Sequence, residues 1–530
     1  MKGEGRGVRG ALVCVGLAMF LAALAQTVVA SILPLMVADV GGFDRYAWPS
    51  SAYLVAATVA YPIVGRLSDI YGRRAFLMGG IAVFVAGSAL VGLSRTMDQV
   101  IGFRAVQGLG GGAVMTCCYV SIADLFAPEE RGKFHGVLGA LYALATVVGP
   151  VLGVFVAEWL SWQYTFLFMA LAGLPVLLLT ARRFPRSGAL PRGWELDYAG
   201  MATLAVAVTA VGLGLSSAEV SHGWYAPQVG GLLALGLVMA GLFAAVELRA
   251  GSPIMPLGIY GNRAVAAAVV VTLLTSAGLH ALVLFLPLYF QLALGVSATQ
   301  AGTMLIPILL GIVLGAIGAG QLLSRAGGRY RVQTVVGTVL MAGGIYFFSV
   351  PGGGGDFSGR MPVILGQVYL IAAALGFGTV VATLSVAVQN GVRFEDVGVA
   401  TAALQFSRSL GGMVGLAATG AVMLGRFRRG VDALVPAEVR GVLPEGLLDA
   451  VKGDPRALVD PAAAEVLREA AAGPGRANLA AADGLLDALH LALTGALGDV
   501  FTVLWVAVAA ALPAAILLGN CEERVKRREE

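Results

Sequence analysis

Residues 65–74 read Gly-Arg-Leu-Ser-Asp-Ile-Tyr-Gly-Arg-Arg and join two apolar runs, 50–67 and 75–94. The glycines Gly65 and Gly72 allow a tight turn, and Asp69 among arginines can form an ion pair at a membrane face. A loop that only fixes membrane orientation needs the arginines, but it needs neither Asp69 nor this glycine spacing. The stretch therefore predicts a turn with a role of its own between two helices.

The composition of the whole chain is that of a membrane protein. Of its 530 residues, 58% are hydrophobic and 12% are charged, about half the usual charged share. Because so few charged residues cannot give a protein of this size a polar surface, we expect most of the surface to face lipid. The four cysteines show no CxxC spacing, the histidines lie far apart and the net charge is only +4. These features do not support a disulfide framework, a metal site or nucleic-acid binding, and we expect no enzymatic activity and no cofactor.

Fourteen apolar runs are long enough to cross a membrane as helices. The predicted spans are 11–34, 50–67, 75–94, 99–123, 135–157, 163–181, 197–217, 226–247, 264–292, 299–323, 331–350, 361–388, 398–424 and 493–518. The first run is longer than a signal peptide and lacks a small-residue cleavage site, so we interpret it as a retained helix.

The distribution of Lys and Arg predicts the orientation. The tails and the loops on one side carry twenty-two of them, and the short loops on the other side carry three. Basic loops stay in the cytoplasm, so we expect a multi-pass protein of the cell (inner) membrane with both termini cytoplasmic. The segment 425–492 is then external, and its stretches 444–452 and 461–472 are either short amphipathic helices or a loosely ordered loop.

The turn at 65–74 resembles the loop signature of the major facilitator superfamily of transporters, GxLxDxxGRR. A weaker echo, Gly320 to Arg329, follows the tenth span, with Ser324 in place of the aspartate. The resemblance implies an all-α fold of two six-helix bundles plus two inserted helices. The domains are then 1–185, 186–257 and 258–530, the last with the external segment. Fourteen spans is the number found in the QacA/EmrB-like drug:proton antiporter branch.

Two further motifs resemble that branch. The fourth span contains Arg104 followed by Gln107 and glycines, similar to the RxxQGxG motif in which the arginine is tied to proton coupling. A cation inside a span usually marks a functional site, although Arg104 is near enough to the span end to extend to the headgroups instead. The fifth span contains Gly149, Pro150 and Gly153, similar to the antiporter motif of exporters; the alternative is an ordinary kinked helix.

One departure concerns proton coupling. Ala25 stands where the branch usually has an aspartate, and no acidic residue lies near the middle of any predicted span. A buried carboxylate there exchanges a proton readily, whereas alanine does not. The remaining candidates for coupling are Arg104, His280, which is the one histidine placed well inside a span, and the outer-end acids Asp39 and Glu158.

A central cavity of a transporter of this kind is expected near the bilayer midplane. Its candidate polar residues are uncharged: Gln26, Thr27, Ser31, Gln107, Tyr119, Tyr142, Gln291 and Gln405, together with His280 and Gln367. Neutral polar and apolar groups suit hydrophobic or amphiphilic solutes.

Three functions are weighed. The first is a multidrug exporter driven by the proton gradient, working by alternating access as a monomer, with the 65–74 turn as its cytoplasmic gate. The second is an exporter or facilitator of lipids or amphiphiles that does not use the missing acid, favoured by Ala25 and the large external segment. The third is a membrane receptor or scaffold, which needs neither Asp69 with its glycines nor Gly149-Pro150. The composition also suggests a bacterial source.

Overall fold

The computed structural model describes residues 4–41, 45, 48–185, 196–220, 226–296, 298–326, 329–349, 360–435, 440, 448, 451–452, 468, 471 and 479–518. Within them the chain forms fourteen helices of 20 residues or more. They are α1 (Glu4–Val40), α2 (Trp48–Tyr71), α3 (Arg73–Gly92), α4 (Met97–Leu125), α5 (Pro128–Trp159), α6 (Trp162–Arg183), α7 (Tyr198–Val220), α8 (Pro227–Glu247), α9 (Arg263–Leu294), α11 (Ile306–Ala326), α12 (Tyr330–Ser349), α13 (Arg360–Gly391), α14 (Val397–Leu434) and α18 (Leu479–Ala509). Short helices are η2 (Leu257–Gly261), α10 (Ala298–Thr303), η3 (Phe394–Asp396) and α19 (Leu512–Leu517).

The predicted all-helical membrane fold is confirmed. Each long helix overlaps one predicted span, and among the described residues 13 segments are long and apolar enough to cross a membrane. The exception is α2, which carries Arg66, Asp69 and several hydroxyl residues. Because α2 packs against α4, α7 and α14, it presents less of its surface to lipid and tolerates this polarity.

Prolines explain two differences from the predicted spans. The tenth span is divided into α10 and α11, and Pro307 lies in the first turn of α11. The fourteenth span is divided near Ala511, and α19 begins just before Pro513. Proline lacks a backbone N–H and fits the first turn of a helix, so it marks a new helix start in both places.

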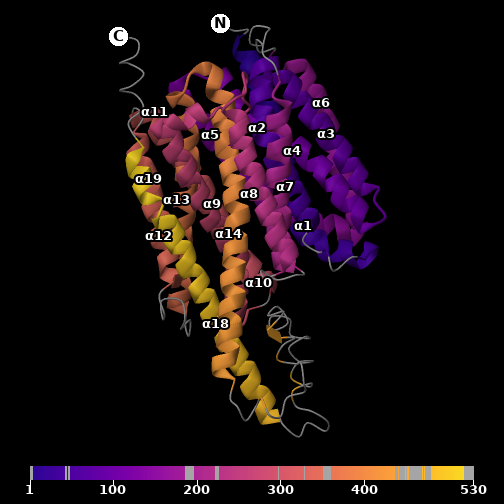
Figure 1. Ribbon diagram of the computed structural model, residues 1–530, viewed down its shortest axis with the longest axis vertical. Coiled ribbons are helices and arrows are strands. Elements are labelled where there is room, and N and C mark those ends of the chain that lie inside the picture. The colour runs from indigo at the N-terminus through magenta and orange to yellow at the C-terminus, as the bar shows by residue number, and fades with distance from the viewer. Residues whose placement is uncertain are drawn as a thin grey trace.

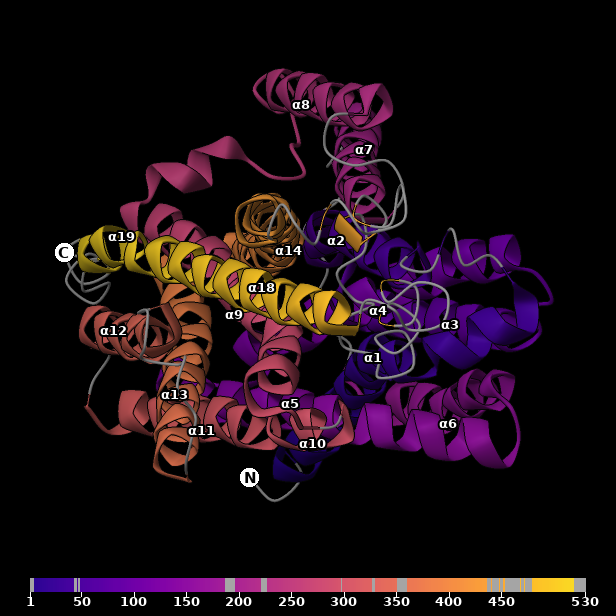
Figure 2. The same ribbon diagram turned by 90° about the horizontal axis from the view of Figure 1, so that it is seen from below.

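Figure 2 shows the helices in two groups with a peripheral pair. Helices α1–α6 pack together, and α9 and α11–α14 pack with α18. The groups meet where α5 contacts α11 and α13, and where α2 and α4 contact α14. Helices α7 and α8 form a pair beside them, in which α7 contacts both α2 and α14.

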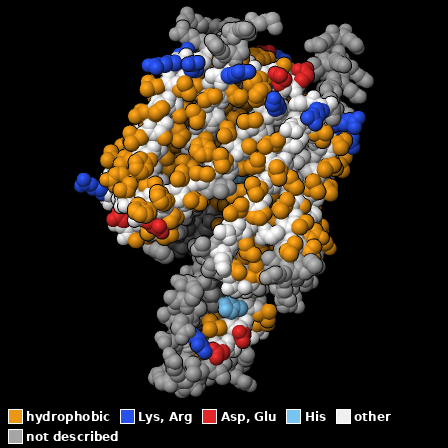
Figure 3. Space-filling model, turned by 180° about the vertical axis from the view of Figure 1, so that it is seen from behind, with side chains coloured by type: hydrophobic (Ala, Val, Ile, Leu, Met, Phe, Trp, Pro, Cys, Tyr) orange, Lys and Arg blue, Asp and Glu red, His pale blue; other side chains and the backbone are white. Residues whose placement is uncertain are grey.

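The flanks of the molecule are apolar. On the face in Figure 3, hydrophobic side chains cover the middle and charged side chains gather toward the ends. Large exposed hydrophobics include Leu237 at 73% and Val151 at 67% of full exposure. Contiguous exposure of this extent suits contact with acyl chains.

The two ends of the helix bundle differ. We call the end with Gly72 and the start of α5 the inner end, and the opposite end the outer end. Both α19 and the start of α1 lie at the inner end (Figure 1). At the outer end α14 and α18 extend beyond the other helices, around a core that includes Phe427, Val431 and Leu489.

This extension lengthens two predicted spans. Helix α14 continues ten residues past the expected end at 424, and α18 begins at Leu479 instead of near 493. Their shared apolar core makes the continuation favourable. The helices considered at 444–452 and 461–472 lie largely outside the described residues.

Glycines of α4 set the spacing of the first bundle. A Cβ atom added to Gly110 would lie 2.3 Å from the backbone nitrogen of Phe84 in α3, and one added to Gly108 would lie 2.3 Å from the carbonyl oxygen of Tyr53 in α2. Helix backbones this close need glycine at the contact. The glycine run after Arg104 therefore fixes how α2, α3 and α4 pack.

We expect Gly110→Ala to destabilise the protein by about 1–3 kcal/mol, because the added methyl group overpacks the α3–α4 contact. Gly102→Ala is the matched control, since it lies in the same helix with nothing within 4 Å of its added Cβ. Thermal unfolding of the purified protein in detergent measures both. Equal midpoints for the two variants would contradict the packing argument.

Candidate functional site

The turn between α2 and α3 has the conformation that its glycine predicts. Gly72 has a φ of 95°, a region that favours glycine, and its N–H donates to the carbonyl of Ser68 at 3.0 Å. The Ser68 hydroxyl donates to the carbonyl of Gly65 at 3.1 Å and accepts from Arg73 at 3.0 Å. The turn is thus rigid, and it holds Asp69 at the end of α2.

Arg73 connects two carboxylates at this turn. Its guanidinium forms an ion pair with Asp69 and a second one with Asp124 at the end of α4, where Nε lies 3.2 Å from Oδ2. Asp69 and Arg73 are 7% and 5% exposed, so water screens their ion pair little. Arg74 instead donates to the carbonyl of Ala181 in α6. The two arginines therefore brace the turn against different helices.

Asp69 also lies against the second bundle. A Cβ atom added to Gly398, in the first turn of α14, would lie 2.2 Å from Oδ1 of Asp69. One added to Gly65 would lie 2.5 Å from Cβ of Ala402. A carboxylate at a helix N-terminus is favoured by the helix dipole. We call Gly65, Asp69, Arg73 and Gly398 the inner latch.

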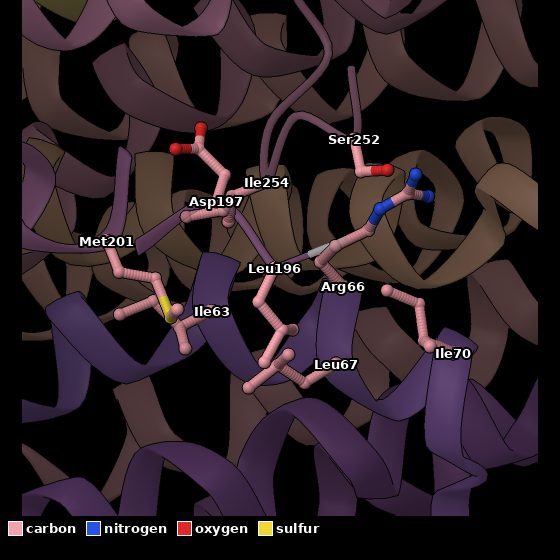
Figure 4. Close-up of a pocket in the computed structure, with 9 residues that line it drawn as sticks. All are labelled: Ile63, Arg66, Leu67, Ile70, Leu196, Asp197, Met201, Ser252 and Ile254. Carbon is pink, nitrogen blue, oxygen red and sulfur yellow. The ribbon is translucent and has the colours of Figure 1, made fainter. Parts of the chain in front are cut away.

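Arg66 of the same turn faces the inserted pair. Together with Asp197, at the start of α7, and Ser252, which follows α8, it lines a small pocket (Figure 4). Asp197 accepts from the N–H of Gly200 at 2.7 Å and caps α7. The pocket places the inner end of α2 in contact with the segments that bound α7 and α8.

Helix α5 contacts a different bundle with each half. In its inner half, a Cβ atom added to Gly132 would lie 2.8 Å from the carbonyl oxygen of Gly320 in α11. In its outer half, one added to Gly149 would lie 2.3 Å from Oγ1 of Thr27, and one added to Gly153 would lie 2.5 Å from Cγ2 of Val28. The motif with Pro150 therefore packs on α1 of the same bundle, not across the bundle interface.

Sequence analysis missed His135 as an interior residue. It lies two turns into α5, is 2% exposed, and its Nε2 lies 2.9 Å from Oε1 of Gln389 in α13. Arg131, one turn earlier, donates to Oδ1 of Asn390 at 2.7 Å. We call His135, Arg131, Gln389 and Asn390 the histidine clamp. The pattern His-x₃-Gly on an apolar helix was the available signal, but its partners lie more than 250 residues away.

The bundles are joined at their inner half. Inter-bundle hydrogen bonds run from Thr58 with Ser409, 2.5 Å apart near the middle, to Asn390 with the carbonyl of Pro128, 3.5 Å apart at the inner end. Throughout the described part of the chain, the hydrogen bonds that cross between the bundles lie within that half. The inner end is closed.

Arg104 does not extend to the headgroups. It is 1% exposed and donates to the carbonyls of Pro49 and Ala25, both at 3.2 Å, and to Oε1 of Gln107 at 2.5 Å. Its guanidinium lies 4.4 Å from the ring centre of Tyr53. Among the described residues it has no acidic partner, so a buried cation is held by carbonyls and an aromatic ring.

The candidate cavity residues form separate groups. Tyr142 of α5 donates to Gln26 of α1 at 3.2 Å. Gln405 of α14 accepts from Arg408 at 2.6 Å, and this arginine lies 5.7 Å from the ring centre of Tyr119. The others bond within their own element or bundle: Thr27 to Ala145, Ser31 to Val28, Gln107 to Ser88 and Gln291 to Pro287. Arg408 thus adds a second cation to the interior.

The remaining coupling candidates lie apart. His280 is half-buried in α9, where its Nδ1 lies 2.8 Å from the Ser276 carbonyl and its ring packs on Gly412 of α14. Asp39 accepts from Trp162 at 2.9 Å and from Gln163 at 2.8 Å, which ties α1 to α6 at the outer end. Glu158 is exposed at the same end. The structure therefore does not bring these three residues together with Arg104.

Two helical bundles with apolar flanks are joined through a glycine-lined interface that holds polar contacts at one end. This is the architecture of a multi-pass membrane protein of the transporter class. The family described as the Major Facilitator Superfamily matches residues 15–416, and the chain belongs to it.

Curated relatives and a solved structure agree with this assignment. The chain is 33% identical over 485 residues to the "Multidrug transporter protein MdtP" of Bacillus subtilis, covering 86% of this chain and 87% of that protein. It is 32% identical to "Multidrug resistance protein 3" of the same organism, covering 78% of each. The fold resembles the human organic anion transporter MFSD10, with a TM-score of 0.56 at 18% identity over 78% of this chain and 93% of the other.

We expect Gly398→Ala to shift the equilibrium away from the closed inner end, because the added methyl group meets the Asp69 carboxylate. Gly425→Ala in the same helix is the control, since its added Cβ has nothing within 4 Å. Both substitutions favour helix by about 1 kcal/mol, so that effect cancels. Accessibility of a cysteine introduced at Ala402 to a soluble maleimide measures the opening; equal labelling rates would refute the latch geometry.

Proposed function

We propose that the protein exports hydrophobic or amphiphilic small molecules by alternating access, as a monomer in the cell (inner) membrane with both termini in the cytoplasm. The observation that carries the proposal is the inner latch, in which the turn of α2–α3 closes on α14. A relative named as a multidrug transporter over most of both chains supports export of drug-like solutes. In this proposal the inner end is the cytoplasmic gate, and opening it admits substrate.

The charges of the interior bear on the substrate class. Arg104 and Arg408 are both in membrane-spanning helices, and Nε of Arg408 is buried with no hydrogen-bond partner among the residues that the structure describes. In the described part of the chain the outer-end acid Asp499 is already paired with Arg426. An interior with two cations repels a further cation. We therefore infer that neutral and anionic amphiphiles are transported in preference to quaternary cations.

We propose that the proton gradient drives export by antiport, and that His280 binds the transported proton. The Ser276 carbonyl can only accept, so Nδ1 of His280 carries the hydrogen and Nε2 carries the lone pair. The His280 ring packs on Gly412 of α14, and in this proposal Nε2 gains and loses the proton during the transport cycle. Arg104 holds α1, α2 and α4 together and positions them.

A second candidate function is export or facilitated movement of lipids, without proton coupling. It is favoured by Ala25, which leaves the first span without an acid, and by the extension of α14 and α18 beyond the bundle at the outer end. Paired apolar helices at that position suit contact with an amphiphile that leaves the bilayer.

Reconstituted vesicles decide between the two. We expect a pH gradient to accelerate export of a neutral fluorescent amphiphile in the wild type, and His280→Ala to abolish that acceleration. If flux in the wild type does not depend on the pH gradient, whereas flux in Ala25→Asp does, the protein is an exporter without proton coupling. Absence of flux for every amphiphile tested would refute transport of this class.

We expect Asp69→Asn to lower flux by about tenfold, because the buried Asp69 carboxylate, which is 7% exposed, stabilises the closed gate. The order of competing substrates should stay unchanged, because the latch lies at the gate and not in the binding region. Competition assays in the same vesicles measure both quantities. Asp98→Asn is the control, since Asp98 is an exposed partner of Arg45 at the outer end. Wild-type flux in Asp69→Asn would contradict the gate role of the turn.

A further inference from the structure

We propose that His135 is a proton-sensitive residue of the inner gate: its neutral imidazole keeps α5 joined to α13, and a proton taken up at the inner end separates the two helices. The inference rests on the proposed function for the meaning of the inner end as the cytoplasmic gate. It adds a proton-binding position that is separate from the turn at 65–74 and from His280.

The contact between His135 and Gln389 joins the two bundles in a fully buried position. Their side chains are 2% and 1% exposed, and the atoms Nε2 and Oε1 lie 2.9 Å apart. The same amide donates to the carbonyl of Tyr119 in α4 at 3.1 Å and to the hydroxyl of Thr401 in α14 at 3.2 Å. One glutamine side chain therefore connects α4, α5, α13 and α14.

These contacts determine the protonation of the imidazole. A backbone carbonyl only accepts, so the amide nitrogen of Gln389 must face Tyr119, and its oxygen must face His135. Nε2 of His135 then donates. Nδ1 carries a lone pair and, in the described part of the chain, has no hydrogen-bond partner although it is buried. The clamp thus contains a vacant proton-acceptor atom.

The surroundings of His135 oppose a positive charge while the inner end is closed. Arg131 lies one turn away on α5, and Arg408 of α14 lies over the ring of Tyr119, which itself stacks on His135 with ring centres 5.8 Å apart. Helix α13 contributes the neutral amides Gln389 and Asn390, and α12 contributes Tyr330 through its bond to Asn390. The nearby carboxylate of Asp124 is paired with Arg73.

The direction of the pH effect follows from this arrangement. An imidazolium in the closed gate is excluded from water, faces arginines and lacks an anion, whereas in the open gate water solvates it. A proton therefore binds the open form more tightly, and acid favours opening by linkage. Because the proton enters and leaves on the same side, it adjusts the gate to cytoplasmic pH and moves no proton across the membrane.

The test measures the gate directly, with no substrate present. Spin labels at Arg182 of α6 and Arg331 of α12, both exposed at the inner end, report the distance between the bundles once the native cysteines are changed to alanine. In the wild type we expect the ratio of open to closed forms to rise at least about tenfold between about pH 8 and about pH 5.5. In His135→Gln, which keeps a donor but does not titrate, we expect a change below about twofold.

Two further variants complete the design. His490→Gln is the control, because His490 is exposed on α18 at the outer end, and it should retain the wild-type pH response. His135→Arg carries a permanent charge and should be open throughout the range. A pH response that persists in His135→Gln, or its absence in the wild type, would overturn the proposal. Since no transport is measured, a missing amphiphile flux would refute the proposed function and leave this result intact.

Discussion

The closed inner end depends on backbone contacts that leave no room for a side chain. On one side of the interface Gly65 lies against Ala402, and Gly398 lies against Asp69; on the other, Gly132 lies against Gly320. Helices from different bundles reach this proximity only through small residues. The hydrogen bonds of the histidine clamp, and the bond of Thr58 with Ser409, require that the bundles first come this close.

The two sides of the interface use equivalent helices with different chemistry. The end of α2 meets the start of α14, and the end of α11 meets the start of α5, as two parallel halves imply. Asp69 supplies a charge on the first side, whereas the equivalent position in the echo of the turn is Ser324, whose hydroxyl donates to the carbonyl of Gly320. On this second side the polar contact comes from α5 itself, through Arg131 and His135. In the proposed gate, one side of the interface therefore has a carboxylate and the other has a titratable imidazole.

Sequence predicted the helices and the turn because their signals are local. Apolar runs predicted the fourteen long helices, and the spacing of Gly65, Asp69 and Gly72 predicted the turn without knowledge of its partners. The histidine clamp could not be predicted, because His135 and Gln389 are separated by 254 positions and no local pattern shows which sides of their helices face each other. The extension of α14 past residue 424 was missed for a related reason, since its apolar core exists only when α18 lies beside it.

The sequence motif around Arg104 could be identified locally, but the groups that surround its charge could not be predicted from the motif. The guanidinium donates to the backbone carbonyl of Ala25 at 3.2 Å, and the methyl side chain of Ala25 supplies no anion. Burying a cation is costly, and three oxygen acceptors with the Tyr53 ring offset that cost without neutralising the charge. In this closed form the charge of Arg104 is therefore not neutralised. If transport is proton-driven as proposed, repulsion by Arg104 and Arg408 weakens proton binding at any titratable group close to them. The distances of these groups from the two arginines therefore constrain the coupling mechanism.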